Sequence, residues 1–134
     1  MVLVGLIIWS AVGPLAQKPG TEVNATEYAE GDCFVDFDAA AESNRTVPCT
    51  ESHSAQLVGS FTAEADEPYP GRDSLEERAG RLCQAETLAL PEATDSLKQR
   101  TAYPSEEGWA SGDRRLDCFI ESTAGNTLTG SFLK

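Results

Sequence analysis

Hydrophobic and polar positions divide the chain into an apolar N-terminal stretch, a polar segment and a longer region of short apolar runs. The stretch from Val2 to Ala16 carries no charged side chain. The segment that follows it is acidic and contains few large apolar residues. We therefore expect residues 1–17 to form a single transmembrane anchor, residues 18–31 an acidic linker, and residues 32–134 an extracytoplasmic folded domain.

The apolar stretch is short for a membrane span. As a helix it would extend for about 22 Å, whereas the hydrocarbon core of a bilayer is about 30 Å thick. Two interpretations stay open: the stretch is part of a longer membrane helix that is retained as an anchor, or it is an atypical export signal that lacks a basic start. We expect the anchor, with the cysteine-bearing region outside the cytoplasm, because bases near the stretch are scarce.

Short strands are predicted at five places by alternation of apolar and polar residues and by β-branched or aromatic content. They are residues 32–37, 46–49, 55–62, 114–121 and 127–133. Pro48 confines the second to a sheet edge or a strand end. Gly59 predicts a bulge or a close approach in the third. A turn at residues 124–126 is expected to join the last two as a hairpin.

One main helix is predicted over residues 74–90. Ser74 and Glu77 fit a capping box, and Pro91 ends the pattern. Its apolar face at helical spacing comprises Leu75, Ala79, Leu82 and Cys83. A shorter helix is expected over residues 95–102, and a turn with an aromatic anchor over residues 105–113. The predicted fold class is α+β: a small antiparallel sheet with one main helix and two disulfides, preceded by a single N-terminal transmembrane helix.

The chain has four cysteines, Cys33, Cys49, Cys83 and Cys118, none of them in a CxxC pair. An even number at wide spacing behind an export or membrane segment favours structural disulfides in an oxidising compartment. Three pairings can be drawn, and the sequence does not choose among them. We favour a bridge from Cys33 to Cys49, which closes a short loop between neighbouring strands and leaves Cys83 to pair with Cys118.

The charge and the remaining polar residues give little support for an enzyme. The formal net charge is −12, from 22 acidic and 10 basic residues, which argues against nucleic-acid partners. His53 could act as a general base or ligand with Glu51, but a turn residue that orders its own loop is the simpler interpretation. Trp109 could form a binding platform, although a core position is favoured. We expect no catalytic residue, no cofactor and no metal, and a candidate interaction loop formed by Glu51, His53, Trp109 and Asp113.

Several short motifs follow one another in order through the folded region. They are residues 31–34 (GDCF), 47–53 (VPCTESH), 58–61 (VGSF), 69–71 (YPG), 103–104 (YP), 108–114 (GWASGDR) and 129–131 (TGS), with Cys83 and Cys118 between them. This ordered set resembles the septum-formation domain family, bacterial envelope proteins with one membrane anchor and an exported domain. Ser52 stands where the family usually has proline. The resemblance implies an extracytoplasmic domain tied to cell division or the envelope, and it transfers no catalytic residue.

Three functional hypotheses follow. The first is a non-catalytic, membrane-anchored module that binds other envelope proteins, at the division septum. The alternative is an accessory subunit of a large membrane complex, such as a respiratory supercomplex, because Gly5, Ser10, Ala11 and Gly13 would allow close contact between helices. An enzyme or metal protein that uses His53 is a third and weaker hypothesis.

Overall fold

The computed structural model describes residues 20–84 and 88–134. The expected transmembrane anchor, residues 1–17, lies outside these residues. Within the part of the chain that is described, none of the helices combines the length and the apolar character that a membrane crossing needs.

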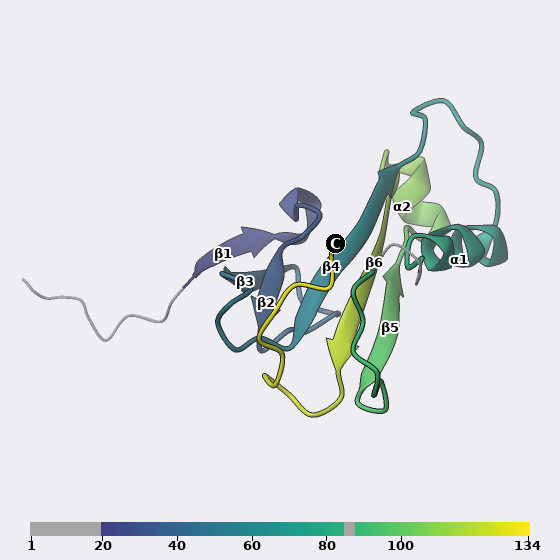
Figure 1. Cartoon of the computed structure of the whole chain (residues 1–134). Coiled ribbons are helices and arrows are strands. Elements are labelled where there is room, and N and C mark those ends of the chain that lie inside the picture. The colour runs from purple at the N-terminus through teal and green to yellow at the C-terminus, as the bar shows by residue number, and fades with distance from the viewer. Residues whose placement is uncertain (1–19, 85–87) are drawn as a thin grey trace, which may run out of the picture.

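Six strands form one antiparallel sheet (Figure 1). The strands are β1 (Thr21–Asn24), β2 (Cys33–Val35), β3 (Ser43–Val47), β4 (Ala55–Thr62), β5 (Leu97–Ala102) and β6 (Arg115–Ser122). Their order across the sheet is β1-β3-β2-β4-β6-β5, and every neighbouring pair is antiparallel. The two edges of the sheet are therefore β1 and β5.

Two α-helices lie beside each other at the β5–β6 end of the sheet (Figure 1). They are α1 (Arg72–Arg81) and α2 (Glu106–Ala110), and a single 3-10 turn, η2 (Ala25–Glu27), follows β1. Leu75 of α1 and Trp109 of α2 are buried in one cluster with Leu116 of β6. We call the side of the sheet that contacts these helices the helix face.

The opposite side of the sheet, here the aromatic face, is covered by η2 and the loop after β2. Its buried residues are Tyr28, Phe34, Leu57 and Phe119, with Phe37 packed against them. The Phe34 and Phe119 rings meet edge to face, with centroids 5.9 Å apart. The small domain thus has apolar cores on both sides of one sheet, which buries β6 almost completely and β4 from Ala55 to Gly59.

The predicted fold class is confirmed for the sheet, the main helix and the disulfides. Cys33 bonds to Cys49 with their Cα atoms 5.3 Å apart. Cys83 bonds to Cys118 with their Cα atoms 5.8 Å apart. The favoured pairing is therefore the observed one, and the first bridge joins β2 to the turn after β3 while the second joins the end of α1 to β6.

The segment expected to be a linker is part of the domain from residue 21 onward. β1 pairs with β3 along Thr21–Asn24, and Tyr28 is buried in the aromatic core. Gly20 makes this possible: its φ is 92°, and a Cβ there would lie 1.6 Å from the Thr46 carbonyl oxygen. The sequence analysis missed this strand because its side chains are mostly exposed at a sheet edge and therefore show no apolar pattern.

The main helix is shorter than predicted and has no capping box. It begins at Arg72, so Ser74 lies inside the first turn, and the N-cap is Gly71 without a side-chain cap. It ends at Arg81 rather than at residue 90. The N–H groups of Leu82 and Cys83 tighten the last turn by donating to Ala79 and Gly80, which leads the chain to the Cys83–Cys118 bond.

The shorter predicted helix, residues 95–102, is wrong because this segment forms β5. Lys, Gln and Arg favour helices, but the free side of β6 offers a full antiparallel ladder to the segment. The expected turn at residues 105–113 contains α2, where the Ser105 side chain accepts from the Gly108 N–H at 3.0 Å.

The predicted C-terminal hairpin is also wrong. Both edges of β6 are already occupied, by β4 and β5, so residues 127–133 have no place beside it. They run instead over the helix face, where Leu128 forms an isolated β-bridge with His53 and Leu133 forms one with Leu88.

Gly59 fulfils its prediction, since the β4–β6 register shifts between Leu57 and Gly59. A Cβ at Gly59 would lie 2.4 Å from the Leu82 carbonyl oxygen, so the missing side chain lets the end of α1 approach β4. Gly59 is also the register partner of Cys118. The close approach therefore brings Cys83 to its disulfide partner.

Gly59→Ala is expected to lower the free energy of unfolding by about 1–3 kcal/mol, because the end of α1 must move away from β4. Urea unfolding followed by circular dichroism measures this change. The matched control is Gly80→Ala, since a Cβ there meets no atom within 4 Å; it should be neutral or stabilise the helix by up to about 1 kcal/mol. Equal stability of Gly59→Ala and the wild type would contradict the close approach.

Candidate functional site: a groove at the start of β6

The residues of the predicted interaction loop lie at two ends of β4. Glu51 is exposed and His53 buried just before this strand, whereas Trp109 packs with Ala63 just after it. Asp113 is exposed near Trp109. Eight residues of extended strand separate the ends by about 23 Å. The structure therefore brings Glu51 near His53 and Trp109 near Asp113, but it does not bring the two pairs together.

His53 is fully enclosed and bonds mainly to the backbone. Its N–H and carbonyl pair with those of Leu128, both at 2.9 Å. Its Nδ1 lies 2.7 Å from the Glu51 carbonyl oxygen, which requires the proton on Nδ1. Nε2 has no hydrogen-bond partner among the described residues. The ring thus orders the loop after Cys49, and the backbone holds the C-terminal segment.

Gln56 performs a related task that the sequence analysis missed. Its side chain is fully buried, and its Nε2 donates to the Gly31 carbonyl at 3.1 Å and to Ser131 Oγ at 2.9 Å. Its Oε1 accepts from the Phe132 N–H at 2.7 Å. A polar residue inside the apolar run of β4 was the available signal, since buried amides need partners.

An open groove of about 640 Å³ lies on the other side of the sheet, where β4 ends and β6 begins. Its lining combines small side chains with four charged ones: Ala25, Thr26, Thr62, Ala63, Ala65, Ala102, Tyr103, Gly112, Asp113, Arg114, Arg115 and Asp117. Of the residues predicted from sequence, only Asp113 lines this groove.

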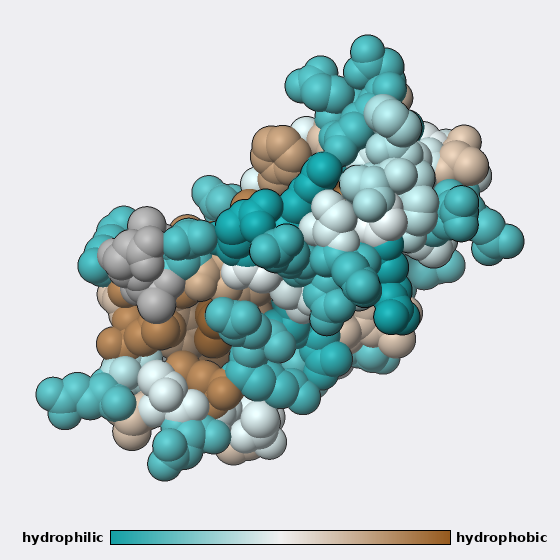
Figure 2. Space-filling view, turned by 90° about the vertical axis from the view of Figure 1, so that its right-hand side faces the viewer, coloured by the Kyte–Doolittle hydropathy of each residue, from teal (hydrophilic) through white to brown (hydrophobic). Residues whose placement is uncertain are grey.

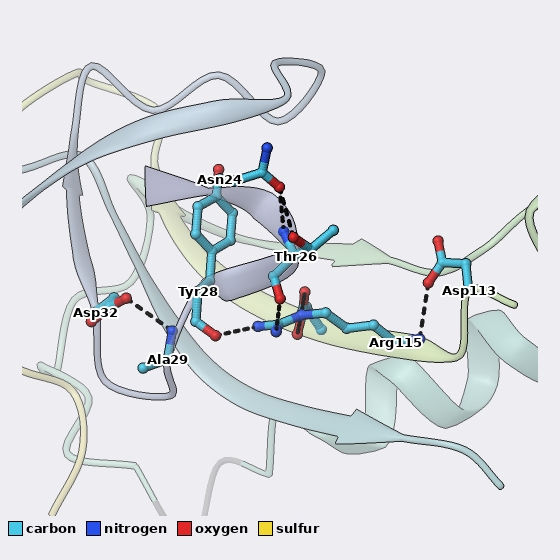
Figure 3. Close-up of polar contacts among 8 residues, drawn as sticks. Asn24, Thr26, Tyr28, Ala29, Asp32, Asp113 and Arg115 are labelled. Carbon is cyan, nitrogen blue, oxygen red and sulfur yellow. Dashed lines mark hydrogen bonds and ion pairs between the residues drawn. The ribbon is translucent and has the colours of Figure 1, made fainter. Parts of the chain in front are cut away.

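Arg115 lies in this groove and attaches the η2 turn to β6 (Figure 3). Its Nε donates to both carboxylate oxygens of Asp117, at 3.0 and 2.8 Å. One terminal nitrogen donates to the Tyr28 carbonyl at 2.6 Å and the other to the Thr26 carbonyl at 3.3 Å. Because the Asp117 side chain is only 7% exposed, this pair is enclosed and its loss is costly.

The η2 turn itself is held by short polar contacts, which Figure 3 also draws. Asn24 Oδ1 accepts from the N–H of Thr26 at 3.0 Å, and Asp32 accepts from the Ala29 N–H at 2.9 Å. The Tyr28 hydroxyl accepts from Asn44 at 2.8 Å. Burial raises the pKa of Tyr28 above its ordinary value, although the Asn44 hydrogen bond opposes this, so the phenol stays protonated.

Arg114 forms the opposite wall. Its guanidinium lies 4.1 Å from the centre of the Trp109 ring and donates to the carbonyls of Glu64 and Ala65. No carboxylate of the described residues forms an ion pair with Arg114. Its charge is met by backbone carbonyls and the Trp109 ring, with a longer-range attraction to the Glu67 carboxylate. The groove lining carries two arginines and two aspartates, so Arg114 is a cation without an ion-pair partner in a groove of no net formal charge.

The loop beside Arg114 is fixed at a second point. Trp109 Nε1 donates to the Glu67 carbonyl at 2.8 Å, and the Glu67 carboxylate pairs with Arg78 of α1 at 2.8 Å. The hydrogen bond from Arg78 lowers the pKa of Glu67. The loop therefore has a defined shape, and so has this side of the groove.

Metal binding finds no support in this arrangement. In residues 20–84 and 88–134, no three His, Cys, Asp or Glu side chains are grouped so that they could hold an ion. The four cysteines are all disulfide-bonded.

The Nδ1 contact of His53 predicts a difference between two amide substitutions. Asparagine can place its amide near the position of Nδ1, whereas glutamine places it near Nε2, where no partner lies. We expect His53→Asn to be more stable than His53→Gln by about 1 kcal/mol, measured by urea unfolding. If His53→Gln is the more stable variant, Nε2 is the atom that the fold uses.

The Arg115–Asp117 pair predicts a strong coupling. Arg115→Ala should lower the free energy of unfolding by about 1.5–3 kcal/mol, because it leaves Asp117 enclosed without its partner. The double variant with Asp117→Ala should cost less than the sum of the single variants. Additive losses in a double-mutant cycle would show that the two side chains do not act together.

Comparison with known proteins supports one relationship. A family model described as septum formation matches residues 31–131. No curated protein and no solved structure matches the chain. The match begins at the Gln56-bonded Gly31 and ends at Ser131, so it spans β2 to the C-terminal segment together with both disulfides. The chain belongs to the septum formation family.

Proposed function

We propose that this chain is a non-catalytic, membrane-anchored module of the bacterial envelope that binds other proteins on the extracytoplasmic side. The family's description relates the domain to cell division, so the proposed partners are proteins of the division septum. The observation that carries the proposal is the groove beside β6, because it combines an open shape and small side chains with an arginine, Arg114, that forms no ion pair among the described residues.

The proposed location is supported by the cysteines and the N-terminal composition. All four cysteines form disulfides, which persist in oxidising compartments and are rare in the cytoplasm. The charge-free stretch from Val2 to Ala16 ends four residues before the first described residue, Gly20. A membrane anchor there would hold the domain close to the surface.

The proposed binding role is supported by how the groove is built. Both of its walls are fixed: Arg115 holds η2 against β6, and Arg114 holds the loop after β4 against α2. A rigid groove loses little conformational entropy when a partner enters it. Arg114 forms no ion pair among the described residues, so its guanidinium favours acidic partner segments.

A structural role of His53 supports the non-catalytic part of the proposal. The ring is enclosed, and its one hydrogen bond serves the backbone two residues away. A general base must reach the proton that it removes.

The proposal predicts that Ala65→Trp releases a partner. The full chain, tagged and extracted in a mild detergent from its own bacterium, should copurify with an envelope protein. Ala65 is exposed and lines the groove, so a tryptophan there should reduce recovery at least tenfold with little change in stability. Ala124→Trp, at an exposed turn that does not line the groove, is the matched control.

The identity of the partner decides between the hypotheses. Division proteins, with a fluorescent fusion concentrated at the septum, support the proposal. A respiratory complex as the partner supports the alternative of an accessory subunit. Recovery of the same partner by Ala65→Trp and the wild type would contradict a role of the groove.

A further inference from the structure

The outer edge of β5 is an open strand edge on the same side of the molecule as the groove. We propose that this edge binds an extended, acidic segment of a partner protein, which adds a seventh strand to the sheet. The inference rests on the proposed binding function and names the way in which the partner is held.

The register of the sheet shows which backbone groups of β5 point outward. The Thr123 N–H donates to the Ser96 carbonyl directly opposite. The same register continues through Lys98↔Glu121 and Arg100↔Phe119. In an antiparallel pair, hydrogen-bonded positions alternate with positions whose N–H and carbonyl groups point away. The outward groups are therefore those of Leu97, Gln99 and Thr101.

The hydrogen bonds between β6 and β4 indicate the same orientation of the backbone groups. The Ser122 N–H donates to the Ser54 carbonyl, so even-numbered residues at this end of β6 point toward β4. The backbone N–H and carbonyl groups of odd-numbered residues such as Glu121 and Phe119 then point toward β5, in agreement with the Thr123–Ser96 hydrogen bond.

Most of these outward groups have no backbone partner in the part of the chain that the structure describes. The Leu97 N–H turns back to the Thr94 carbonyl, but the backbone of Gln99 and Thr101 bonds to nothing beyond β5. The N–H and carbonyl groups of Gln99 and Thr101 lie two residues apart, a spacing of about 6.6 Å, which matches the repeat of hydrogen-bonding groups along an added strand. A sheet edge of this kind is a template for strand addition.

Figure 2 views the molecule from the side on which β5 is the outermost strand, and its middle is mainly hydrophilic. Lys98, Gln99 and Ala102 of β5 are exposed. Helix α1 packs on the helix face and contacts β5 as well as β6, and no described strand pairs with the outer edge of β5. Among the described strands, none already occupies the position that an added strand would take.

The charges along β5 select an acidic partner. The strand contains Lys98 and Arg100 and no acidic residue. Arg100 pairs with Glu121 at 2.9 Å, whereas no carboxylate among the described residues forms an ion pair with Lys98. Lys98 and Arg100 alternate with Gln99, so both project from the aromatic face, beside the groove.

The groove continues toward this edge. A smaller hollow of about 80 Å³ shares Ala25, Ala102 and Asp117 with the large groove, and Arg100 and Thr101 of β5 also line it. Alternate side chains of an added strand would point to the aromatic face and lie next to these hollows. Backbone bonds would give affinity, and the hollows would select small side chains.

A second copy of this chain fits the edge less well. Pairing two β5 edges would place two basic strands against each other, and like charges across strands destabilise a sheet. The same two residues that favour an acidic segment therefore disfavour self-association.

The test is a screen of random twelve-residue peptides, displayed on phage, against the full chain in a mild detergent. Selected peptides should be acidic and free of proline at alternate positions. Lys98→Glu should weaken their binding at least tenfold. Arg72→Glu, the same charge change at the exposed start of α1, is the matched control and should stay within twofold of the wild type.

Gln99→Pro tests the backbone directly. The Gln99 N–H points outward, so proline removes an edge donor without removing a bond to β6, and edge strands accept proline at such positions. Binding should be lost while circular dichroism and the unfolding midpoint stay near the wild type. If Gln99→Pro is unfolded, the comparison of Lys98→Glu with Arg72→Glu decides alone.

Three results would overturn the proposal: selected peptides that are not acidic, binding that Lys98→Glu leaves unchanged, or self-association that Gln99→Pro abolishes in sedimentation experiments. Copurification of the envelope partner distinguishes failure of this proposal from failure of the proposed function. A partner that is lost with Ala65→Trp but still recovered with Gln99→Pro would leave the binding function in place and reject the edge.

Discussion

The fold depends on β6 being paired along both edges. β4 occupies one edge and β5 the other, so the strand lies inside the sheet with its residues almost completely buried. Its two faces then carry both cores, with Phe119 on the aromatic face and Leu116 on the helix face. The same strand holds Cys118, which fixes the end of α1, and Arg115, which fixes η2. The elements α1 and η2 are thus both attached directly to one central strand.

The C-terminal segment is held in a different way, by buried polar groups instead of a continuous ladder. His53 bonds to Leu128 through the backbone, and Gln56 bonds to Ser131 and Phe132 through its side chain. Satisfied polar groups in a core specify one arrangement, because a shifted segment would leave them without partners. The segment therefore covers the helix face in a single register although it forms only isolated bridges.

The sequence was sufficient for elements whose signal is local. Alternation located β4 and β6, Gly59 marked the bulge, and the spacing of the cysteines favoured the observed pairs. β5 was missed because its Lys, Gln and Arg residues favour a helix, and only the vacant side of β6 makes them a strand. The groove could not be predicted, since Thr26 and Arg115 are 89 residues apart and meet only through the sheet order. Gln56 was visible as a polar residue in an apolar run, but its partners are distant in sequence.

The position of β1 has a consequence for how the domain would be presented. β1 is the first element of the described chain and one edge of the sheet, and β5 is the other edge. Five strand spacings of about 4.8 Å separate them, so they lie about 24 Å apart. A domain tethered through β1 would hold β5 at its far end from the point of attachment. The sheet would then act as a rigid arm that sets the reach of the domain, and its width would decide how far from the attachment point a partner can be engaged.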